Sequence, residues 1–226
     1  MKLNGKRVVV TGASRGLGLA LSQALARRGA GVVMVARAVE PLQAAVQAVS
    51  AAGGEAHAIA LDVSKARSIY PLAAQAAELL GGVDILINNA STLGAVPLRS
   101  LLETECEDMV SVLETNTVGP FRLTKAMLGP MLLRGEGLIV NISSDAARQP
   151  YPTWGAYSLS KAALEQMTAV WKSELEGTGV DFLCVDPGEM DTRMHADAMP
   201  EADTTTLASP NDVADRILDR IEGEKS

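Results

Sequence analysis

The chain has 226 residues, of which 47% are hydrophobic, 21% are charged and 3% are aromatic, with a mean hydropathy of +0.14. This composition supplies a sizeable aliphatic core, so it excludes general disorder and is typical of a single domain over residues 1–226. The net charge of −7 and the few aromatic residues argue against nucleic acid or an anionic membrane as a partner. No apolar run approaches the ~18 residues of a membrane span, and Cys106 and Cys184 are too few for a disulfide framework, so we expect a cytoplasmic protein.

Aliphatic runs bounded by glycine alternate with longer segments of helical periodicity. The runs predict six strands, at 7–11, 31–36, 56–61, 85–88, 138–142 and 180–185. Helices are predicted at 16–28, 40–52, 64–80, 104–134, 155–176 and 211–221, and Ser64 is expected to cap the third. Because parallel neighbours need crossover connections, this alternation predicts an α/β fold with a doubly wound parallel sheet.

Two stretches interrupt the regular pattern. Gly119-Pro120 and Pro130 predict a kink or a break within 104–134. Residues 186–209 have weak periodicity, and we expect a loop there, with 188–209 forming a lid over a substrate. Three methionines either pack this lid against its own core or line an adaptable wall for an apolar substrate: Met190, Met194 and Met199.

A glycine-rich turn joins the first strand to the first helix. Its spacing is G-x-x-x-G-x-G, from Gly12 through Gly16 to Gly18, and differs from the common G-x-G-x-x-G of dinucleotide sites. Gly12 permits a tight turn, Gly16 lets a diphosphate approach the backbone at the helix N-terminus, and Gly18 lets the helix pack close to the strand. The turn alone leaves both nucleotide binding and a plain strand-to-helix connection open.

The end of the second strand indicates which dinucleotide would bind. An acidic residue there selects NAD, whereas an arginine accommodates the additional phosphate of NADP. The strand ends in Ala36-Arg37, and Arg15 in the glycine-rich turn is a second candidate for that phosphate. Both arginines are alternatively ordinary solvated residues, but the missing acid favours NADP(H).

Tyr157 and Lys161 lie four residues apart in a predicted helix, and therefore on one face of it. The lysine charge would lower the pKa of the phenol from about 10 toward working pH, as a general acid or base requires. Ser144 follows the fifth strand, so it meets the glycine-rich turn at the carboxyl edge of the sheet and can donate to a substrate carbonyl. Taken separately, Ser144 is alternatively an ordinary turn serine, and the spacing of Tyr157 and Lys161 is alternatively a chance pairing.

In their order and spacing these motifs resemble the short-chain dehydrogenase/reductase family, over residues 6 to about 192. The resemblance rests on the glycine-rich turn, Asn88-Asn89-Ala90, Asn116, Ser144, Tyr157-x-x-x-Lys161 and Pro187-Gly188. It implies a Rossmann-type sheet of strand order 3-2-1-4-5-6 in which Tyr157 is the catalytic acid or base. It also implies that Lys161 binds the nicotinamide ribose and tunes the tyrosine, that Ser144 orients the carbonyl, and that Asn116 holds a water in a proton relay.

The same resemblance implies a set of NADP(H)-binding residues. Asp62 and Val63 would contact the adenine, and the segment from Pro187 to Thr192 would cover the nicotinamide. The complete implied set is Gly12, Ser14, Arg15, Gly16, Leu17, Gly18, Arg37, Asp62, Val63, Asn89, Ala90, Tyr157, Lys161, Pro187, Gly188 and Thr192. No metal site is expected, since His57 and His195 have no acidic cluster of ligand spacing around them.

Two features depart from the family's usual pattern. Ser91 stands where the family commonly has glycine, which adds a side chain near the cofactor. The customary seventh strand has no counterpart after the last predicted helix, and in relatives that strand helps to build one interface of a tetramer. We therefore expect a homodimer through 104–134 and 155–176, with a tetramer as the alternative.

These observations predict an NADP(H)-dependent oxidoreductase that moves a hydride between nicotinamide and a small or medium carbonyl or alcohol substrate. The alternative is a non-catalytic NADP(H)-binding regulatory protein of the same fold, and an epimerase or dehydratase of the longer related families is disfavoured. Three residues precede Tyr157 in the loop that the family uses beside the substrate: Gln149, Tyr151 and Trp154. Trp154 is alternatively a packing residue.

Overall fold

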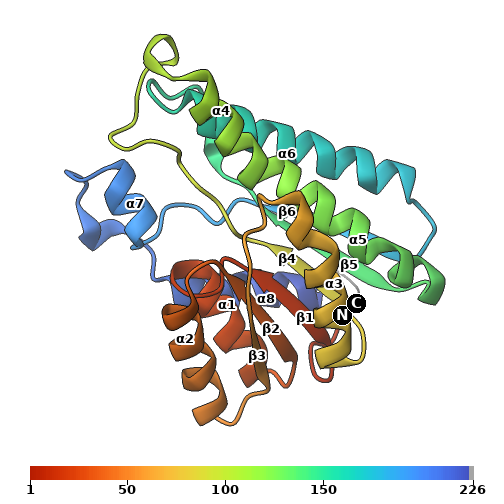
Figure 1. Cartoon of the computed structure of the whole chain (residues 1–226). Helices are drawn as coiled ribbons and strands as arrows, with labels where there is room; N and C mark the ends of the chain where they lie inside the picture. The colour runs from red at the N-terminus through yellow and green to blue at the C-terminus, as the bar shows by residue number, and fades with distance from the viewer. Residues whose placement is uncertain (224–226) are drawn as a thin grey trace.

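The computed structural model describes residues 1–223, and its centre is a six-stranded parallel sheet (Figure 1). The strands are β1 (Arg7–Thr11), β2 (Gly31–Ala36), β3 (Ala56–Ala60), β4 (Ile85–Asn88), β5 (Gly137–Ile142) and β6 (Val180–Val185). Their order is β3-β2-β1-β4-β5-β6, which confirms the predicted order. The order reverses between β1 and β4, and sheets of this kind bind ligands outside the carboxyl ends of the strands at such a point.

Helices cover both faces of the sheet (Figure 1). One layer contains α1 (Gly16–Arg27), α2 (Val39–Ala51) and α8 (Pro210–Gly223). The other contains α3 (Ala66–Leu80), α5 (Gly119–Arg134) and α6 (Gly155–Glu174). Successive residues of one strand serve the two layers: Val8 and Val10 pack toward the first, and Val9 packs toward the second. Because such a strand is buried on both faces, every position in it is apolar, which explains the continuous aliphatic run in the sequence.

The break expected within 104–134 is confirmed. The helix α4 (Cys106–Leu113) passes into α5 through a π-helical segment, Glu114–Val118, that ends just before Gly119-Pro120. A Cβ on Gly119 would lie 2.8 Å from the Val63 carbonyl oxygen, so glycine lets α5 approach the end of β3 closely. The π-helical segment brings Asn116 into the interior, where it is 1% exposed.

The expectation that Ser64 caps the third helix is wrong. The helix α3 begins at Ala66, and no side chain caps its first turn. The Ser64 hydroxyl donates instead to Oδ1 of Asp62 at 2.8 Å, and the Ser64 N–H donates to the same oxygen at 2.9 Å. An aspartate that accepts from the backbone two residues ahead forms a local turn, and this turn uses the serine before the helix begins.

The lid segment has more regular structure than its weak periodicity predicts. It contains the short helix α7 (Arg193–Ala198), a 3-10 turn at Thr204–Thr206, and a β-bridge between Met190 and Ala208. Thr192 caps α7, because its Oγ1 accepts from the His195 N–H at 3.3 Å. Among residues 1–223, none of the helices combines the length and apolar character that a bilayer crossing requires.

Candidate active site

The strands β1 and β4 are neighbours in the sheet (Figure 1), and hydrogen bonds tie together the residues that follow them at its carboxyl edge. The backbone N–H groups of Asn89 and Ala90 both donate to Thr11 Oγ1 at 3.0 Å. The Asn89 amide donates to the carbonyl oxygen of Thr11 at 2.9 Å and to that of Gly12 at 3.3 Å. The Asn88-Asn89-Ala90 motif thus holds the shape of the glycine-rich turn, and the Asn89 amide nitrogen is engaged within the fold.

The three motif glycines have different surroundings. A Cβ on Gly12 would lie 2.8 Å from Ala90 Cα, and a Cβ on Gly18 would collide with the Gly12 carbonyl oxygen, so both positions need glycine for packing. A Cβ on Gly16 would meet only Thr192 of the lid, at 3.6 Å. The first turn of α1 has no side-chain cap, so its backbone N–H groups are available to an anion in the space beside Gly16.

Arg15 and Arg37 are both exposed next to this turn. Neither forms a hydrogen bond or an ion pair with a side chain in the part of the chain that is described. The charge of Arg37 nevertheless reaches Asp62 at the end of the neighbouring strand. Burial opposes ionisation of Asp62, but hydrogen bonds from Ser64 and the charge of Arg37 lower its pKa overall. The ends of β2 and β3 therefore present a positive group beside an ionised carboxylate.

Tyr157 lies in the first turn of α6 and is 8% exposed. The Trp154 ring packs against it edge to face, with ring centroids 5.7 Å apart and an interplanar angle of 71°. Burial raises the pKa of Tyr157 to about 12, although the hydroxyls of Ser144 and Ser91 act in the opposite direction. The sequence predicts a lowered pKa, and this prediction is wrong for the structure because desolvation of the phenolate exceeds the effect of its neighbours.

Lys161 is 2% exposed one turn further along α6. Its Nζ donates to the Ile142 carbonyl oxygen at 2.7 Å and lies 5.5 Å from the centroid of the Tyr157 ring. Burial lowers the pKa of Lys161 to about 8. An ammonium carries three donors, and within residues 1–223 the Ile142 carbonyl is the one acceptor that it reaches. Two N–H groups are thus left for a ligand or for water.

Ser144 follows β5 and caps a 3-10 turn, Asp145–Ala147. Its Oγ accepts from the Ala146 N–H at 3.2 Å and donates to Asp145 Oδ1 at 3.0 Å. The Tyr151 hydroxyl donates to the other oxygen of Asp145 at 2.7 Å, and this bond lowers the pKa of the carboxyl group. The turn therefore fixes the Ser144 hydroxyl at the carboxyl end of β5, on the side of Tyr157.

Asn116 joins two segments of the site through its side chain. Its Oδ1 accepts from the Thr92 N–H at 2.8 Å, and its Nδ2 donates to the Thr92 carbonyl oxygen at 2.8 Å. The same Nδ2 donates to Ser160 Oγ at 2.9 Å. Because Ser160 precedes Lys161, these bonds hold the loop after β4 against α6. The amide nitrogen of Asn116 has both of its N–H groups in use.

An apolar wall surrounds the Tyr157 ring, and the sequence predicted only part of it. The wall consists of Leu93, Leu98, Ala146, Trp154, Met194 and Ala198. Leu93 and Leu98 were missed, although their position directly after the Asn88-Asn89-Ala90 motif was an available signal. Of the three lid methionines, Met194 belongs to the wall, whereas Met190 packs on the core of the α1 layer and Met199 is exposed.

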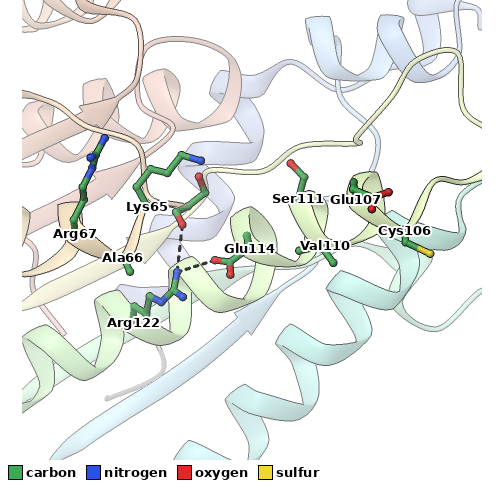
Figure 2. Close-up of a pocket in the computed structure, with 10 residues that line it drawn as sticks. Lys65, Ala66, Arg67, Cys106, Glu107, Val110, Ser111, Glu114 and Arg122 are labelled. Atoms are coloured by element: carbon green, nitrogen blue, oxygen red, sulfur yellow. Dashed lines mark hydrogen bonds and ion pairs between the residues drawn. The ribbon is translucent and has the colours of Figure 1, made fainter.

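A cavity of about 690 Å³ opens elsewhere, between the start of α3 and α4 (Figure 2). Arg122 lies within its lining, with Nη1 donating to Glu114 Oε2 at 2.7 Å and to the Ser64 carbonyl oxygen at 3.2 Å. None of Tyr157, Lys161 and Ser144 lines this cavity. A much smaller pocket is lined by Tyr157, Trp154, Leu98 and their neighbours, so the predicted chemistry belongs to that side of the molecule.

The family model for short chain dehydrogenase matches residues 6–203. The chain belongs to the short-chain dehydrogenase/reductase (SDR) family. The resemblance inferred from the motifs is confirmed, and the protein is an SDR oxidoreductase of a family in which NAD(P) is the typical cofactor.

Known relatives agree with this family along nearly the whole chain. The chain is 38% identical over 226 residues to the ketoacyl reductase HetN of Nostoc sp., with 98% of this chain and 77% of that protein covered. The chain spans 63% of the length of a short chain dehydrogenase of Pseudocercospora fijiensis, to which it is 37% identical over 86% of its own length. It spans 17% of the length of the glycine betaine reductase ATRR of Emericella nidulans, to which it is 34% identical over 96% of its own length. Two solved structures are similar: a metagenomic short-chain oxidoreductase in complex with NADP and an actinorhodin polyketide ketoreductase with NADPH. The first has a TM-score of 0.82 and 31% identity over 96% of this chain and 90% of its own. The second has a TM-score of 0.88 and 32% identity over 94% of this chain and 88% of its own.

Proposed function

We propose that this SDR oxidoreductase uses NADP(H) to reduce a ketone or aldehyde of small or medium size, and to oxidise the corresponding alcohol. The observation that carries the proposal is the meeting of Ser144, Tyr157 and Lys161 at the carboxyl edge of the sheet, beside the uncapped start of α1. The names of similar proteins support it, since one is a ketoacyl reductase and another is a ketoreductase with NADPH.

The residues present fit a nicotinamide dinucleotide phosphate. The surroundings of Gly16, where a Cβ would contact only Thr192, and the uncapped N–H groups at the start of α1 suit a diphosphate, and Arg15 and Arg37 suit a 2′-phosphate. Asp62 and Val63 would hold the adenine, and the segment from Pro187 to Thr192 would cover the nicotinamide. The cofactor would supply the hydride to the carbonyl carbon.

Tyr157 supplies the proton in this proposal. A phenol with a pKa of about 12 is protonated at neutral pH, so its O–H can donate to a carbonyl oxygen that is gaining negative charge. The Ser144 hydroxyl has a single proton, which it donates to Asp145 in the absence of substrate; in the proposed complex this O–H would turn to the same carbonyl oxygen and orient it. The bond that breaks is the phenol O–H, and the resulting phenolate lies near the Lys161 ammonium, which stabilises it.

Lys161 and Asn116 support this proton transfer. The two free N–H groups of Lys161 would bind ribose hydroxyls and one water that returns a proton to Tyr157. Since both N–H groups of the Asn116 amide are in use, a water held by Asn116 would hydrogen-bond an oxygen of that residue. The side-chain bonds of Asn116 keep the loop after β4 and α6 in register for this relay.

The substrate has an apolar substituent on its carbonyl group in this proposal. The side chains packed around Tyr157 include Leu93, Leu98, Trp154 and Met194 and are apolar, although Arg99 and Asp108 also line the small pocket beside them. Methionine adapts its shape to irregular ligands, so the wall accommodates related substituents.

We also propose a homodimer through α4, α5 and α6, because those helices expose Val110, Phe121, Leu159 and Val170.

The proposal is tested by following NADPH absorbance with a panel of ketones, aldehydes, quinones and acyl thioesters. Tyr157→Phe should lower kcat by ~10²–10⁴, the range that general acid catalysis contributes, while NADPH still binds. Tyr70→Phe, which changes an exposed tyrosine of α3, is the matched control. If Tyr157→Phe turns over as fast as the parent, the assignment of the acid is wrong. NADPH binding without turnover of any substrate favours the regulatory alternative.

A further inference from the structure

Three consecutive residues at the end of β5 are held by side chains of α6. Asn141 Nδ2 donates to Thr168 Oγ1 at 2.8 Å, and the Ile142 carbonyl oxygen accepts from Lys161. Ser143 is the third, 2% exposed, and its Oγ donates to Oε1 of Glu165 at 2.7 Å. The next residue is Ser144, so the bond between Ser143 and Glu165 is the last tie before the proposed carbonyl-binding serine.

Glu165 lies on the same face of α6 as the proposed catalytic pair. It follows Lys161 by four residues and Tyr157 by eight, and positions four apart are neighbours on a helix surface. Its side chain is 26% exposed, so it is shielded enough for its hydrogen bonds to matter and is not a solvated surface carboxylate. The helix α6 therefore carries both Tyr157 and Glu165, and Glu165 holds the segment between β5 and Ser144.

The carboxylate of Glu165 continues into a chain of polar contacts. Its second oxygen, Oε2, lies 3.7 Å from Arg148 Nε, just after the turn that Ser144 caps. The same arginine lies 3.4 Å from Asp186 Oδ2 through its terminal nitrogen, and Asp186 Oδ1 accepts from the Gly188 N–H at 3.0 Å. One carboxylate thus connects α6 to the ends of both β5 and β6.

We propose that Glu165 is a positioning residue that fixes the distance between the Ser144 hydroxyl and the Tyr157 phenol. It acts through Ser143, whose hydroxyl it holds, whereas the contact with Arg148 is an ion pair to an exposed side chain and adds little. The inference deepens the proposed function, since it rests on Ser144 and Tyr157 acting on one carbonyl oxygen. A small misplacement of such groups reduces the rate because productive geometry tolerates little error.

The test compares Glu165→Ala and Glu165→Gln with the parent. Glu165→Ala should lower kcat about tenfold while KM changes much less, since the ground-state contacts of the substrate are unaltered. Glu165→Gln should restore most of kcat, because its amide oxygen still accepts from Ser143. Glu174→Ala, which changes an exposed glutamate of the same helix, is the matched control and should leave kcat unchanged.

A double-mutant cycle separates positioning from general stability. If Glu165 acts through the Ser143 hydroxyl, Ser143→Ala and Glu165→Ala combined should be little worse than Glu165→Ala alone. Additive losses of kcat, or a lowered Tm with kcat of the folded enzyme unchanged, would overturn the proposal.

Amide hydrogen exchange of residues 143–149 provides a readout that needs no substrate. Exchange there should become faster in Glu165→Ala and stay as in the parent in Glu165→Gln and Glu174→Ala. Unchanged exchange in Glu165→Ala would refute the inference even for a parent that is active. A parent inactive on every substrate, with faster exchange in Glu165→Ala, would count against the proposed function and not against the role of Glu165 in holding this turn.

Discussion

The Lys161 ammonium lies 5.5 Å from the centroid of the Tyr157 ring while it donates its hydrogen bond to the Ile142 carbonyl, one strand away. Burial lowers the pKa of Lys161 to about 8 and raises that of Tyr157 to about 12, so it disfavours the charged form of each. The protein therefore holds a neutral phenol next to a costly buried cation. When the Tyr157 phenol loses its proton, the Lys161 ammonium is already in place to stabilise the phenolate. The proposed reaction uses this stabilisation.

Replacing Lys161 should change how stability depends on pH. The folded-state pKa of about 8 lies below the reference value near 10.4, so between these values the unfolded chain binds more protons than the folded one. The free energy of unfolding of the parent should therefore rise relative to Lys161→Met, by about 2 kcal/mol between pH 8 and 10. Urea denaturation of both variants across this range measures it.

The control for that series is Lys172→Met, which changes an exposed lysine on the same helix. Its difference from the parent should stay constant between pH 8 and 10. A constant difference for Lys161→Met as well would show that burial does not penalise the Lys161 charge. Lys161→Met should also lose most of its turnover, because the phenolate then forms without its cation.

Arg37 should determine the cofactor preference. In Arg37→Asp a charge-assisted contact to the 2′-phosphate is replaced by repulsion, so the Kd for NADPH should rise about a hundredfold while that for NADH does not rise. Fluorescence titration measures both constants without catalysis. Arg27→Ala, at the other end of α1, should change neither constant. If the parent binds NADH more tightly than NADPH, the preference has been assigned wrongly.

Trp154 should control the size of the substrate substituent. In Trp154→Ala the edge-to-face contact with Tyr157 and a large part of the apolar wall are lost. KM for a ketone with a bulky apolar group should rise about tenfold, in line with the loss of a few methylene contacts, whereas a methyl ketone should be affected less. Trp154→Phe keeps an aromatic ring, so its KM for the bulky ketone should lie between that of the parent and that of Trp154→Ala. Equal changes for both ketones would show that Trp154 only stabilises the fold.

The strands were predictable because a strand buried on both faces must be apolar at every position. The bounds of β1, β2, β4 and β6 agree with the predicted runs to the residue, and β5 begins one residue earlier, at Gly137. The site could be located for a related reason: Ser144 and the glycine-rich turn follow strands, and parallel strands bring their ends to one edge. Position in the chain was then enough to place these groups together.

What the sequence did not predict depends on environment rather than on position. Spacing placed Lys161 on the same face as Tyr157, but the direction of the Tyr157 pKa follows from how completely the ring is covered by Trp154 and Leu93. Glu165 carried no motif, and its role depends on the register of α6 against β5. The failed cap at Ser64 has the same origin, because Asp62 competes for the serine before α3 starts.

Asp84 should support the fold at the edge of the sheet opposite the site, without contributing to catalysis. Its side chain is 10% exposed, accepts from the Arg7 backbone N–H at 3.0 Å and from Arg7 Nε at 2.9 Å, and lies 3.5 Å from Arg134. Burial opposes ionisation of Asp84, but these partners lower its pKa overall, so its contribution to stability is present above the reference pKa near 3.9 and is lost as pH falls further.

Asp84→Asn should therefore cost about 2 kcal/mol of unfolding free energy at pH 7, a value reduced from that of a fully buried pair because both arginines are about one-third exposed. The difference from the parent should shrink below about pH 4, because the unfolded chain then takes up a proton on this carboxyl group while the folded carboxylate, with its lowered pKa, still resists protonation. Asp197→Asn, which removes an exposed ion pair with Arg193, should cost less than about 1 kcal/mol. In Asp84→Asn, kcat at 25 °C should be unchanged. If the loss of unfolding free energy in this variant stays constant down to pH 2, then the hydrogen-bonding shape of the side chain, and not its charge, secures β1 to β4.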